Sequence, residues 1–451
     1  MKRIFITLLL SGLLTQIADC QTIVKQDPEI AAMVKEISSQ NIEKHIRKLV
    51  SFDTRHNMSN QTSQTKGIGA SWNWIKAEFE TYIPSSGGRL TVAFDEYTIG
   101  GENQRIPRVI TLKNVVATLK GTDPTDTRII MMSAHFDSRA LRDTDSTNLA
   151  PGANDDASGV AAMLEIARII SVKGYPATII FTAVSGEEHG LYGAKNLATR
   201  AKAENWNIIA LLNNDMIGNA DSNETLLYDN MRVRVFSEGV PAYETEAMAA
   251  QRRTTAGEND GKARQLARYI KEVGERYVEQ LEVTLVFRND RFGRGGDHTP
   301  YCQEGFTAVR ISEFNENYDR QHQVPRVENG RQYGDLPEFV NYEYVRKNTG
   351  INLATIVNLA KAPNEPVNCG LRTSGGNSTT LVWEEPKAGK KPAGYYVLIR
   401  ETYMPLWQKK IFVTGTTATL PYSKDNYFFA IQSVDDGGHE SLPVFPGQAR
   451  R

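Results

Sequence analysis

Cysteine is scarce in this sequence, charge of neither sign is in excess, and no long apolar run follows the first residues. The 451 residues include only three cysteines, too few for a disulfide framework: Cys20, Cys302 and Cys369. The 52 basic and 53 acidic residues nearly cancel, so the charge balance favours neither nucleic acid nor an anionic membrane surface as a partner. A helix that spans a bilayer needs about 20 apolar residues, and no run after the N-terminus reaches that length.

The N-terminus departs from this ordinary composition. The chain opens on Met-Lys-Arg, residues 4–14 are mostly apolar, and the small residues Ala18 and Cys20 lie two apart. Basic, apolar and then small residues follow one another in secretory signals. We therefore expect residues 1–20 to be a signal peptide and the protein to be exported, either secreted or periplasmic. Lipid attachment at Cys20 is the rival outcome, which Asp19 disfavours, and a buried N-terminal helix is the structural alternative.

A large first part of the chain alternates apolar runs with helical patterns. The apolar runs predict strands at 90–94, 114–119, 128–134, 177–183, 208–212 and 308–311. Helical spacing predicts helices at 30–46, 70–82, 159–170, 191–200 and 263–277. Unbroken apolar strands between helices indicate an α/β fold with a mostly parallel sheet buried on both faces. Ligands of such sheets collect beyond the carboxyl ends of the strands.

Toward the C-terminus the pattern changes to short strands without helices. Turn residues recur about every ten positions there, which is typical of a small all-β sandwich. The spacing of Trp383, Tyr395 and residues 427–434 resembles the core of a fibronectin type III domain. We therefore expect one domain at 21–362 and a second at 363–451, the latter a passive appendage or spacer.

Acidic and imidazole side chains follow three successive strands of the predicted sheet. Strand ends are followed in turn by His135 and Asp137, by Glu187 and Glu188, and by Asp215. The ends of parallel strands lie side by side, and carboxylates crowded there repel one another unless cations hold them. Imidazole and carboxylate without thiolate suit zinc in an open, catalytic site. Two metals bridged by one carboxylate are the usual hydrolytic arrangement.

Each feature alone has an ordinary structural explanation. A His-x-Asp pair is usually a satisfied core histidine or a surface pair, Glu-Glu a helix start, and the Asn-Asp-Asp-Ala-Ser-Gly run at 154–159 a helix cap. Their occurrence at consecutive strand ends favours a metal site. A second imidazole is required if each metal is to have one. His189 would point away from Glu188, and spacing does not choose between His298 and His322.

Taken together, the motifs resemble a known family. His-Phe-Asp-Ser, Gly-Ala-Asn-Asp-Asp-Ala-Ser-Gly, Gly-Glu-Glu and Asn-Asp-Met-Ile-Gly have the order and spacing of zinc aminopeptidases of the bacterial leucyl aminopeptidase and aminopeptidase Y type. The wider family includes glutamate carboxypeptidase and glutaminyl cyclase. The resemblance covers about residues 42–360. It implies a zinc exopeptidase fold and two Zn²⁺ ions that activate water to remove N-terminal residues from peptides with a free N-terminus.

The resemblance also implies roles for the matched residues. It implies Glu187 as the general base and the following zinc ligands: His135 and Asp215 on one ion, Glu188 and His322 on the other, and Asp155 between them. Asp137 would fix the tautomer of His135. The peptide bond from Asp155 to Asp156 would be cis, and His298 would lie near the pocket without binding metal.

Two features depart from the family pattern. Many members have a tyrosine directly before the last histidine, where it helps to hold the oxyanion, whereas this chain has Gln321. Either Gln321 or the nearby Tyr318 could take its place. The insertion at 219–262 is also poorly matched, and we expect it to supply pocket walls and therefore specificity.

Three other functions fit parts of the pattern. A glutaminyl cyclase binds one zinc and generally lacks the complete dinuclear set, so His135 and Asp155 together argue against it. An inactive binding protein would not need an intact Glu187. A carboxypeptidase needs cations for the substrate carboxylate, and the candidates are Arg291, Arg294 and Arg310. An acidic pocket suits a free α-amine, which favours the aminopeptidase.

Overall fold

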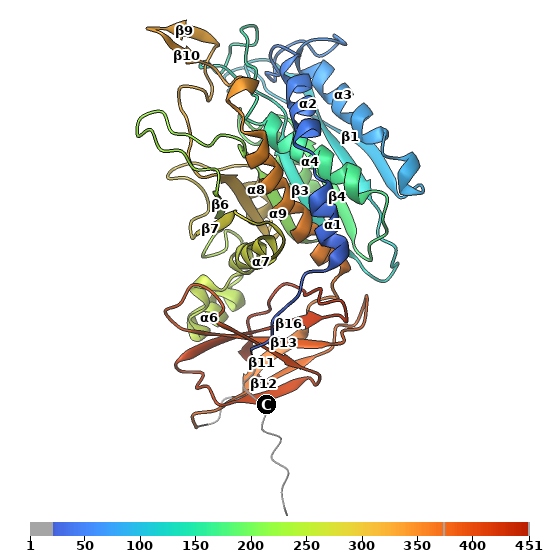
Figure 1. The fold of residues 1–451 in the computed structure, drawn as a ribbon, viewed down its shortest axis with the longest axis vertical. Helices are drawn as coiled ribbons and strands as arrows, with labels where there is room; N and C mark the ends of the chain where they lie inside the picture. Colours follow the sequence, from blue (N-terminus) through green and yellow to red (C-terminus); the bar gives the residue numbers. More distant parts are fainter. Residues whose placement is uncertain (1–20, 373–374, 450–451) are drawn as a thin grey trace, which may run out of the picture.

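The computed structural model describes residues 21–372 and 375–449 (Figure 1). Its centre is an eight-stranded sheet in the order β1-β2-β4-β3-β5-β8-β6-β7. The middle strands run parallel: β4 (Thr178–Val184), β3 (Arg128–His135), β5 (Asn207–Asn214) and β8 (Ala308–Glu313). The strands that flank this parallel group run antiparallel to it: β2 (Ile110–Leu119) pairs with β4 on one side, and β6 (Arg232–Phe236) pairs with β8 on the other. The outermost strands are β1 (Leu90–Ile99) and β7 (Glu282–Val286).

Helices cover both faces of this sheet (Figure 1). One face carries α1 (Pro28–Glu36), α2 (Ser39–Val50), α3 (Gly67–Glu80), α4 (Ala157–Ile170), α7 (Lys262–Tyr277) and α9 (Tyr342–Lys361). The other carries α5 (Tyr192–Ala203) and α8 (His298–Gln303). Successive strand residues point to opposite faces, and accordingly Ile130 and Met132 pack in the larger core while Met131 packs in the smaller one. The expected α/β class with a mostly parallel sheet is confirmed.

The strands and helices predicted from sequence are present, except that the stretch at 30–46 forms two helices, α1 and α2, separated by the extended residues Ile37 and Ser38. Several other elements were not predicted. The longest of these is α9, whose helical spacing is hidden by polar residues on its buried faces. Asn352 is fully buried and its amide donates to Asn348 O at 2.8 Å, while the Thr349 hydroxyl donates to Val345 O at 2.7 Å. Because these side chains bond to the helix's own backbone, they can be buried without an apolar pattern.

Two further sheets form the C-terminal part of the chain. One has the order β15-β12-β11-β17, with β11 (Val367–Arg372), β12 (Thr379–Glu384), β15 (Thr417–Leu420) and β17 (Gly447–Gln448). The other has the order β14-β13-β16, with β13 (Gly394–Glu401), β14 (Lys409–Val413) and β16 (Tyr427–Val434). Trp383 and Tyr395 meet edge to face, with 5.3 Å between ring centroids. The domain boundary and the fibronectin type III likeness stay predictions.

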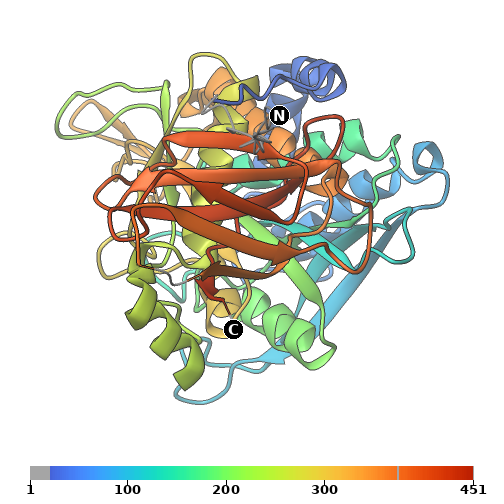
Figure 2. The same ribbon diagram turned by 90° about the horizontal axis from the view of Figure 1, so that it is seen from below.

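These sheets lie at the end of the central sheet where its parallel strands begin (Figures 1 and 2). Arg128 opens β3, and its guanidinium donates to the carbonyls of Ala362 at 2.7 Å and Pro363 at 3.1 Å. In a second contact, the buried Asp260 pairs with Arg268 of α7 at 3.2 Å and with Arg400 of β13 at 2.5 Å. The C-terminal sheets are therefore joined to the first part by buried ion pairs as well as by the linker.

The described chain begins with a segment that runs along the C-terminal sheets. The Thr22 N–H donates to Lys410 O at 2.8 Å, and the Lys410 N–H donates to Gln21 Oε1 at 3.0 Å. At the end of this segment, Asp27 lies 2.6 Å from Lys361 Nζ and 2.7 Å from His439 Nε2. Residues 21–27 thus connect both parts of the molecule.

The insertion at 219–262 is divided between the two ends of the sheet. Its first residues lie at the carboxyl ends of the parallel strands, where Asp221 pairs with Arg320. Because β6 runs antiparallel to β8, the chain then leaves that end, and α6 (Glu246–Thr255) packs beside β17. The later part instead lines a cavity of about 320 Å³ next to the C-terminal sheets. The expectation that the whole insertion supplies walls of the candidate site is therefore wrong for its second half.

Cys302 and Cys369 are both free. The expected signal peptide, with Cys20, lies outside the described residues. Among the helices of residues 21–372 and 375–449, none combines the length and apolar character that a membrane span requires.

Candidate metal centre

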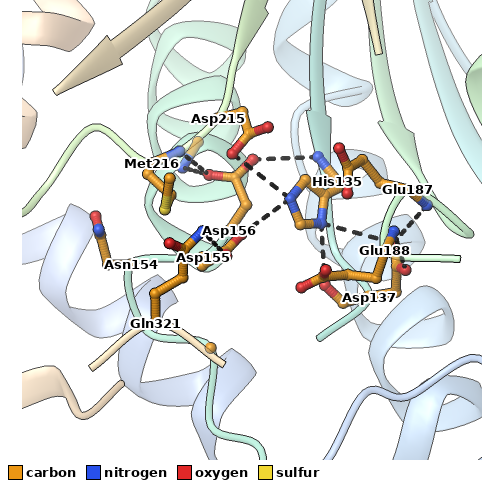
Figure 3. A network of polar contacts seen from close by, with 12 residues as sticks. His135, Asp137, Asn154, Asp155, Asp156, Glu187, Glu188, Asp215, Met216 and Gln321 are labelled. Carbon is orange, nitrogen blue, oxygen red and sulfur yellow. Dashed lines mark hydrogen bonds and ion pairs between the residues drawn. The ribbon is translucent and has the colours of Figure 1, made fainter. Parts of the chain in front are cut away.

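The residues singled out from the sequence gather at the carboxyl ends of the parallel strands (Figure 3). They come from four strand ends and one helix start: His135 closes β3, Glu187 and Glu188 follow β4, Asp215 follows β5, His322 lies after β8, and Asp155 precedes α4. A mostly parallel sheet brings such ends to one edge. The geometry falls into two groups of donor atoms.

The first group is built around His135. Its Nε2 lies 3.1 Å from Asp155 Oδ1 and 3.8 Å from Asp215 Oδ1. Figure 3 shows the ring between these two carboxylates and Asp137. Donor atoms of His135, Asp215 and Glu187 all lie within 4.8 Å of one another, which is close enough for one metal ion.

The second group is built around His322. Its Nε2 lies 3.0 Å from Asp155 Oδ2 and 3.1 Å from Glu188 Oε1. Donor atoms of Asp155, Glu188 and His322 again lie within 4.8 Å of one another. The two oxygens of Asp155 therefore face one imidazole each, as a bridging carboxylate would.

The donor set fits zinc chemically. It consists of imidazole and carboxylate without thiolate, which is the composition of many catalytic zinc sites. Glu188 is buried, and its Oε1 makes no hydrogen bond although it lies near His322 Nε2. Burial disfavours the charged form of His322, yet Glu188 and Asp155 outweigh it and raise the pKa of this histidine to about 10. Positive charge at this place therefore stabilises the crowded carboxylates, and metal ions would supply that charge.

Asp156 holds the strand ends and the helix start together. Its Oδ1 accepts hydrogen bonds from the N–H groups of Gly159 in α4 and Met216 after β5, both at 3.1 Å. Its Oδ2 accepts from the N–H of His135 at 3.2 Å. The peptide bond between Asp155 and Asp156 is cis, as the resemblance implied.

Asp137 contacts His135 and the backbone that carries Glu187 and Glu188. Its carboxylate accepts from the N–H groups of Glu187 at 3.3 Å and Glu188 at 3.2 Å, and from the Asn57 amide at 2.7 Å. His135 Nδ1 lies 3.0 Å from the backbone oxygen of Asp137 and 3.6 Å from its Oδ1. An acceptor beside Nδ1 keeps the proton there and leaves Nε2 free for a metal.

Two buried residues that support the Asp155 loop were missed from the sequence. Asp335 accepts from the N–H groups of Asn154 at 2.9 Å and Asp155 at 2.8 Å. Arg55 donates to Phe136 O at 2.6 Å and to Gly152 O at 2.9 Å. Both lie outside the motifs and reach the site only through the fold, so no local pattern marks them.

The other two candidate histidines, His189 and His298, contact backbone oxygens outside the two donor groups. His189 Nε2 lies 2.8 Å from Asp143 O, so its ring points away from the donor groups as expected. His298 Nε2 lies 2.9 Å from Asn289 O and belongs to neither group.

Of the two residues considered for the oxyanion, only Gln321 lies at the donor groups. Its Nε2 donates to Asp155 Oδ2 at 3.1 Å. Tyr318 is 55% exposed, and its hydroxyl donates to Glu316 at 3.4 Å. Of the two side chains, Gln321 is therefore the one whose amide reaches the donor groups.

Two arginines contact the carboxylates of the site. Arg310, fully buried in β8, lies 3.1 Å from Asp215 Oδ1. Arg139 follows the His-Phe-Asp-Ser motif, and its Nε lies 2.9 Å from Glu188 Oε2. A cation within an apolar strand marks Arg310 in the sequence, whereas no pattern assigns a role to Arg139.

Comparison with known proteins gives consistent results. The model of peptidase family M28 matches residues 114–330. A probable zinc metalloprotease of Leptosphaeria maculans is 44% identical over 422 residues, which cover 93% of this chain and 97% of that protein. The fold is similar to that of the LapA aminopeptidase of Legionella pneumophila, with a TM-score of 0.53 and 19% identity over 80% of both chains. An aminopeptidase from Aneurinibacillus sp. strain AM-1 has a TM-score of 0.50 and 15% identity, over 72% of this chain and 95% of that one.

Proposed function

This chain belongs to peptidase family M28 and is a zinc metallopeptidase, and we propose that it is an aminopeptidase with two zinc ions in its site. One observation carries the two-ion proposal: each oxygen of Asp155 faces a different imidazole, at 3.1 Å from His135 and 3.0 Å from His322. We assign His135 and Asp215 to one ion and Glu188 and His322 to the other.

Release of N-terminal residues is supported by how the cations near the site are used. A carboxypeptidase needs a free cation for the substrate's terminal carboxylate. Of the three candidate arginines, Arg310 is paired with Asp215 and Asp290, and Arg291 is paired with Asp290 and Glu316. Arg294 is exposed and forms no ion pair with the described residues, so the two buried cations, and not all three, are occupied. The crowded carboxylates suit the ammonium of a free N-terminus. Two proteins of similar fold are also named aminopeptidases.

The chain's own residues account for the proton transfers. When bound, zinc ions polarise the scissile carbonyl and lower the pKa of water to about 7. Glu187 takes the proton from the attacking water and passes it to the nitrogen of the leaving amine as the C–N bond breaks. Burial raises the pKa of Glu187 well above its usual range, although His135 opposes this shift. A raised pKa suits a carboxylate that must accept a proton near neutral pH.

A backbone contact positions Glu187, and Gln321 is placed to contact the substrate carbonyl. The N–H of Glu187 is held by Asp137, so this side chain starts from a fixed point beside the His135 group. The Gln321 amide is the donor placed to hold charge that develops on the substrate carbonyl oxygen.

Peptides blocked at one end test the direction of cleavage. We expect an aminoacyl-anilide to release its anilide, and the same compound with an acetylated amine to be inert. Amidation of a peptide's C-terminus should leave cleavage unchanged. Cleavage that tolerates acetylation and is abolished by C-terminal amidation would instead establish a carboxypeptidase.

Export is proposed separately, from the first residues of the chain. Residues 1–20 have the order of a secretory signal, and we propose that their removal leaves Gln21 as the first residue. Mass spectrometry of the protein from the exported fraction would show an N-terminal peptide that begins at Gln21, free or cyclised. A peptide that retains Met1 would contradict export, and a lipid mass on Cys20 would establish the anchored form.

A further inference from the structure

We propose that the cavity between the first part of the chain and the C-terminal sheets binds a small apolar molecule that carries an ammonium group. This cavity of about 320 Å³ lies beside α6 and the C-terminal sheets, whereas both metal groups lie at the opposite end of the central sheet. It is therefore a second site, separate from the one that would carry out peptide hydrolysis.

The walls of the cavity come from segments that meet only in the folded chain. They are α6 with the residues before it, the start of α7, the turn after α8, the linker and the loop before β17. Much of the surface that they present is apolar, from Met248, Phe306, Leu442 and Phe445. Cavities of about 300–1,000 Å³ with mostly apolar walls and a few polar groups, placed where two parts of a protein meet, are typical sites for small molecules.

Two carboxylates on these walls have no cation within ion-pair distance. In the part of the chain that the structure describes, Glu365 forms no hydrogen bond or ion pair, and Glu238 accepts one hydrogen bond, from the N–H of Ala242 at 2.9 Å. Burial raises the pKa of both groups, and the more distant charges of Lys262 and Arg264 offset this effect only in part. The ammonium of a ligand would supply the positive charge that both carboxylates lack.

The other acidic groups that line the cavity are already paired. Glu244 meets Arg252 through two contacts, at 2.8 and 3.0 Å. The buried Asp260 lies between two arginines, as described above. Because these carboxylates have their cations within the protein, only Glu238 and Glu365 are available to a charged ligand.

Helix α6 provides a way into the cavity. None of its residues is buried, and Met248 on it is 46% exposed, as Tyr243 just before it is 45% exposed. A segment with few buried contacts opens at low cost in free energy. A ligand can therefore enter beside α6 while the core of the central sheet stays packed.

Three phenyl compounds of similar shape and different charge test the class of ligand: 2-phenylethylamine, 2-phenylethanol and phenylacetate. In titration calorimetry with the full chain, the amine should bind at least about ten-fold more tightly than the alcohol, because the alcohol lacks the charge-assisted hydrogen bond. Phenylacetate should bind more weakly than the alcohol, since its charge has the wrong sign. Equal affinities for the amine and the alcohol, or tighter binding of phenylacetate, would overturn the inference.

The double variant Glu238→Gln and Glu365→Gln locates the ammonium. It should bind the amine and the alcohol with similar affinities, because neither amide side chain carries charge. Its thermal midpoint should not fall, since both replaced carboxylates are without a cationic partner. A preference for the amine that survives in this folded variant would assign the binding to other carboxylates, such as those of the metal centre, and would overturn the inference.

Glu244→Gln is the matched control. Glu244 lines the same cavity but is already paired with Arg252. Its replacement should leave the preference for the amine in place. Loss of this preference in Glu244→Gln as large as that in the double variant would mean that the total charge of the cavity, and not the two unpaired carboxylates, selects the ligand.

Crystals of the wild-type protein soaked in 2-phenylethylamine provide a test that needs no variant. The phenyl ring should lie against the apolar wall, with the nitrogen within hydrogen-bond distance of Glu238 or Glu365. An empty cavity, amine density only at the metal centre, or a nitrogen turned away from both carboxylates would overturn the inference.

Discussion

Glu187 and Glu188 are neighbours in the chain, and their surroundings give them different tasks. Glu188 has one oxygen 3.1 Å from His322 and the other 2.9 Å from Arg139, so its carboxylate is held at both atoms. Glu187 is held only through its backbone N–H, which donates to Asp137. Burial raises the pKa of Glu187. The side chain of Glu187 is not held and takes up protons readily, which suits a general base. The side chain of Glu188 is held at both oxygens, which suits a metal ligand.

We expect Glu187→Gln to keep its zinc and to lose turnover by about 10²–10⁴-fold, the usual contribution of a general base. The amide retains the shape of the side chain but cannot accept the proton. Steady-state hydrolysis and metal content measure the two effects. Glu246→Gln, an exposed position on α6, is the control and should behave as the wild type. Near-normal turnover by Glu187→Gln would show that another group moves the proton.

Asp155→Ala should lose metal as well as activity, because both donor groups use this carboxylate. Elemental analysis after dialysis should find less zinc per chain than in the wild type, because both metal positions lose a ligand. Full occupancy in this variant would show that Asp155 does not bridge.

The sequence indicates which residues form the site but not all those that support it. His135, Glu187 and Asp215 could be found because strands end beside them and parallel strands share an edge. Asp335 and Arg55 belong to distant segments and hold backbone groups of the Asp155 loop, so only the folded chain brings them there. Their side chains act through hydrogen bonds that leave no periodic signal.

At the scale of elements, hydrophobic pattern predicts a strand well where both its faces are buried. β3 and β4 are unbroken apolar runs, and they were located to within a few residues. α9 was missed because Asn352 and other polar residues on it bond internally and are buried. The register of β6 against β8 and of β7 against β6 depends on pairing that short strands do not encode locally.

The contact of Asp260 with α7 and β13 gives a prediction at this scale. Asp260 lies buried between Arg268 and Arg400. Removing one member of a buried ion pair leaves uncompensated charge and typically costs about 3–5 kcal/mol. Asp260→Asn should lower the thermal midpoint strongly, whereas Asp425→Asn, at an exposed position in the turn before β16, should not. An unchanged midpoint for Asp260→Asn would mean that the arginines find other partners.

The ion pairs of Asp27 should make the stability of the fold depend on pH in the acidic range. Burial opposes ionisation of Asp27, but hydrogen bonds from Lys361 and His439 prevail and lower its pKa to about 2. A carboxyl whose pKa is depressed in the folded state stabilises above its unfolded value of about 3.9, and this contribution is lost as pH falls toward 2. The midpoint difference between wild type and Asp27→Asn should therefore shrink from pH 5 to pH 2.5. A constant difference would contradict this origin.

At the scale of the whole molecule, the candidate site and the C-terminal sheets lie at opposite ends of the central sheet (Figure 1). The parallel strands carry His135 and Asp215 at their carboxyl ends, while Arg128 at the start of β3 binds the linker. The contact between the two parts was not foreseen, because Arg268 and Arg400 are charged residues whose burial depends on partners far away in sequence. The C-terminal sheets therefore contact the first part of the chain, and neither group of donor atoms includes a residue from them.

A chain that ends at residue 362 tests whether the C-terminal sheets are a passive appendage. Truncation would leave Arg276 of α7 without Glu440 and the buried Asp260 without Arg400, and would remove the partner of the Tyr269 hydroxyl. We expect the shortened protein to be poorly soluble or to melt well below the full chain. A truncated protein with an unchanged thermal midpoint would establish the sheets as a spacer.

The central claim is that two zinc ions meet at Asp155, and it is tested most directly by counting zinc per chain in the purified mature protein while following aminoacyl-anilide hydrolysis. We predict two zinc ions at saturation, loss of activity on chelation, and recovery when zinc is returned. One zinc per chain, or hydrolysis that persists after the metal is removed, would contradict the account.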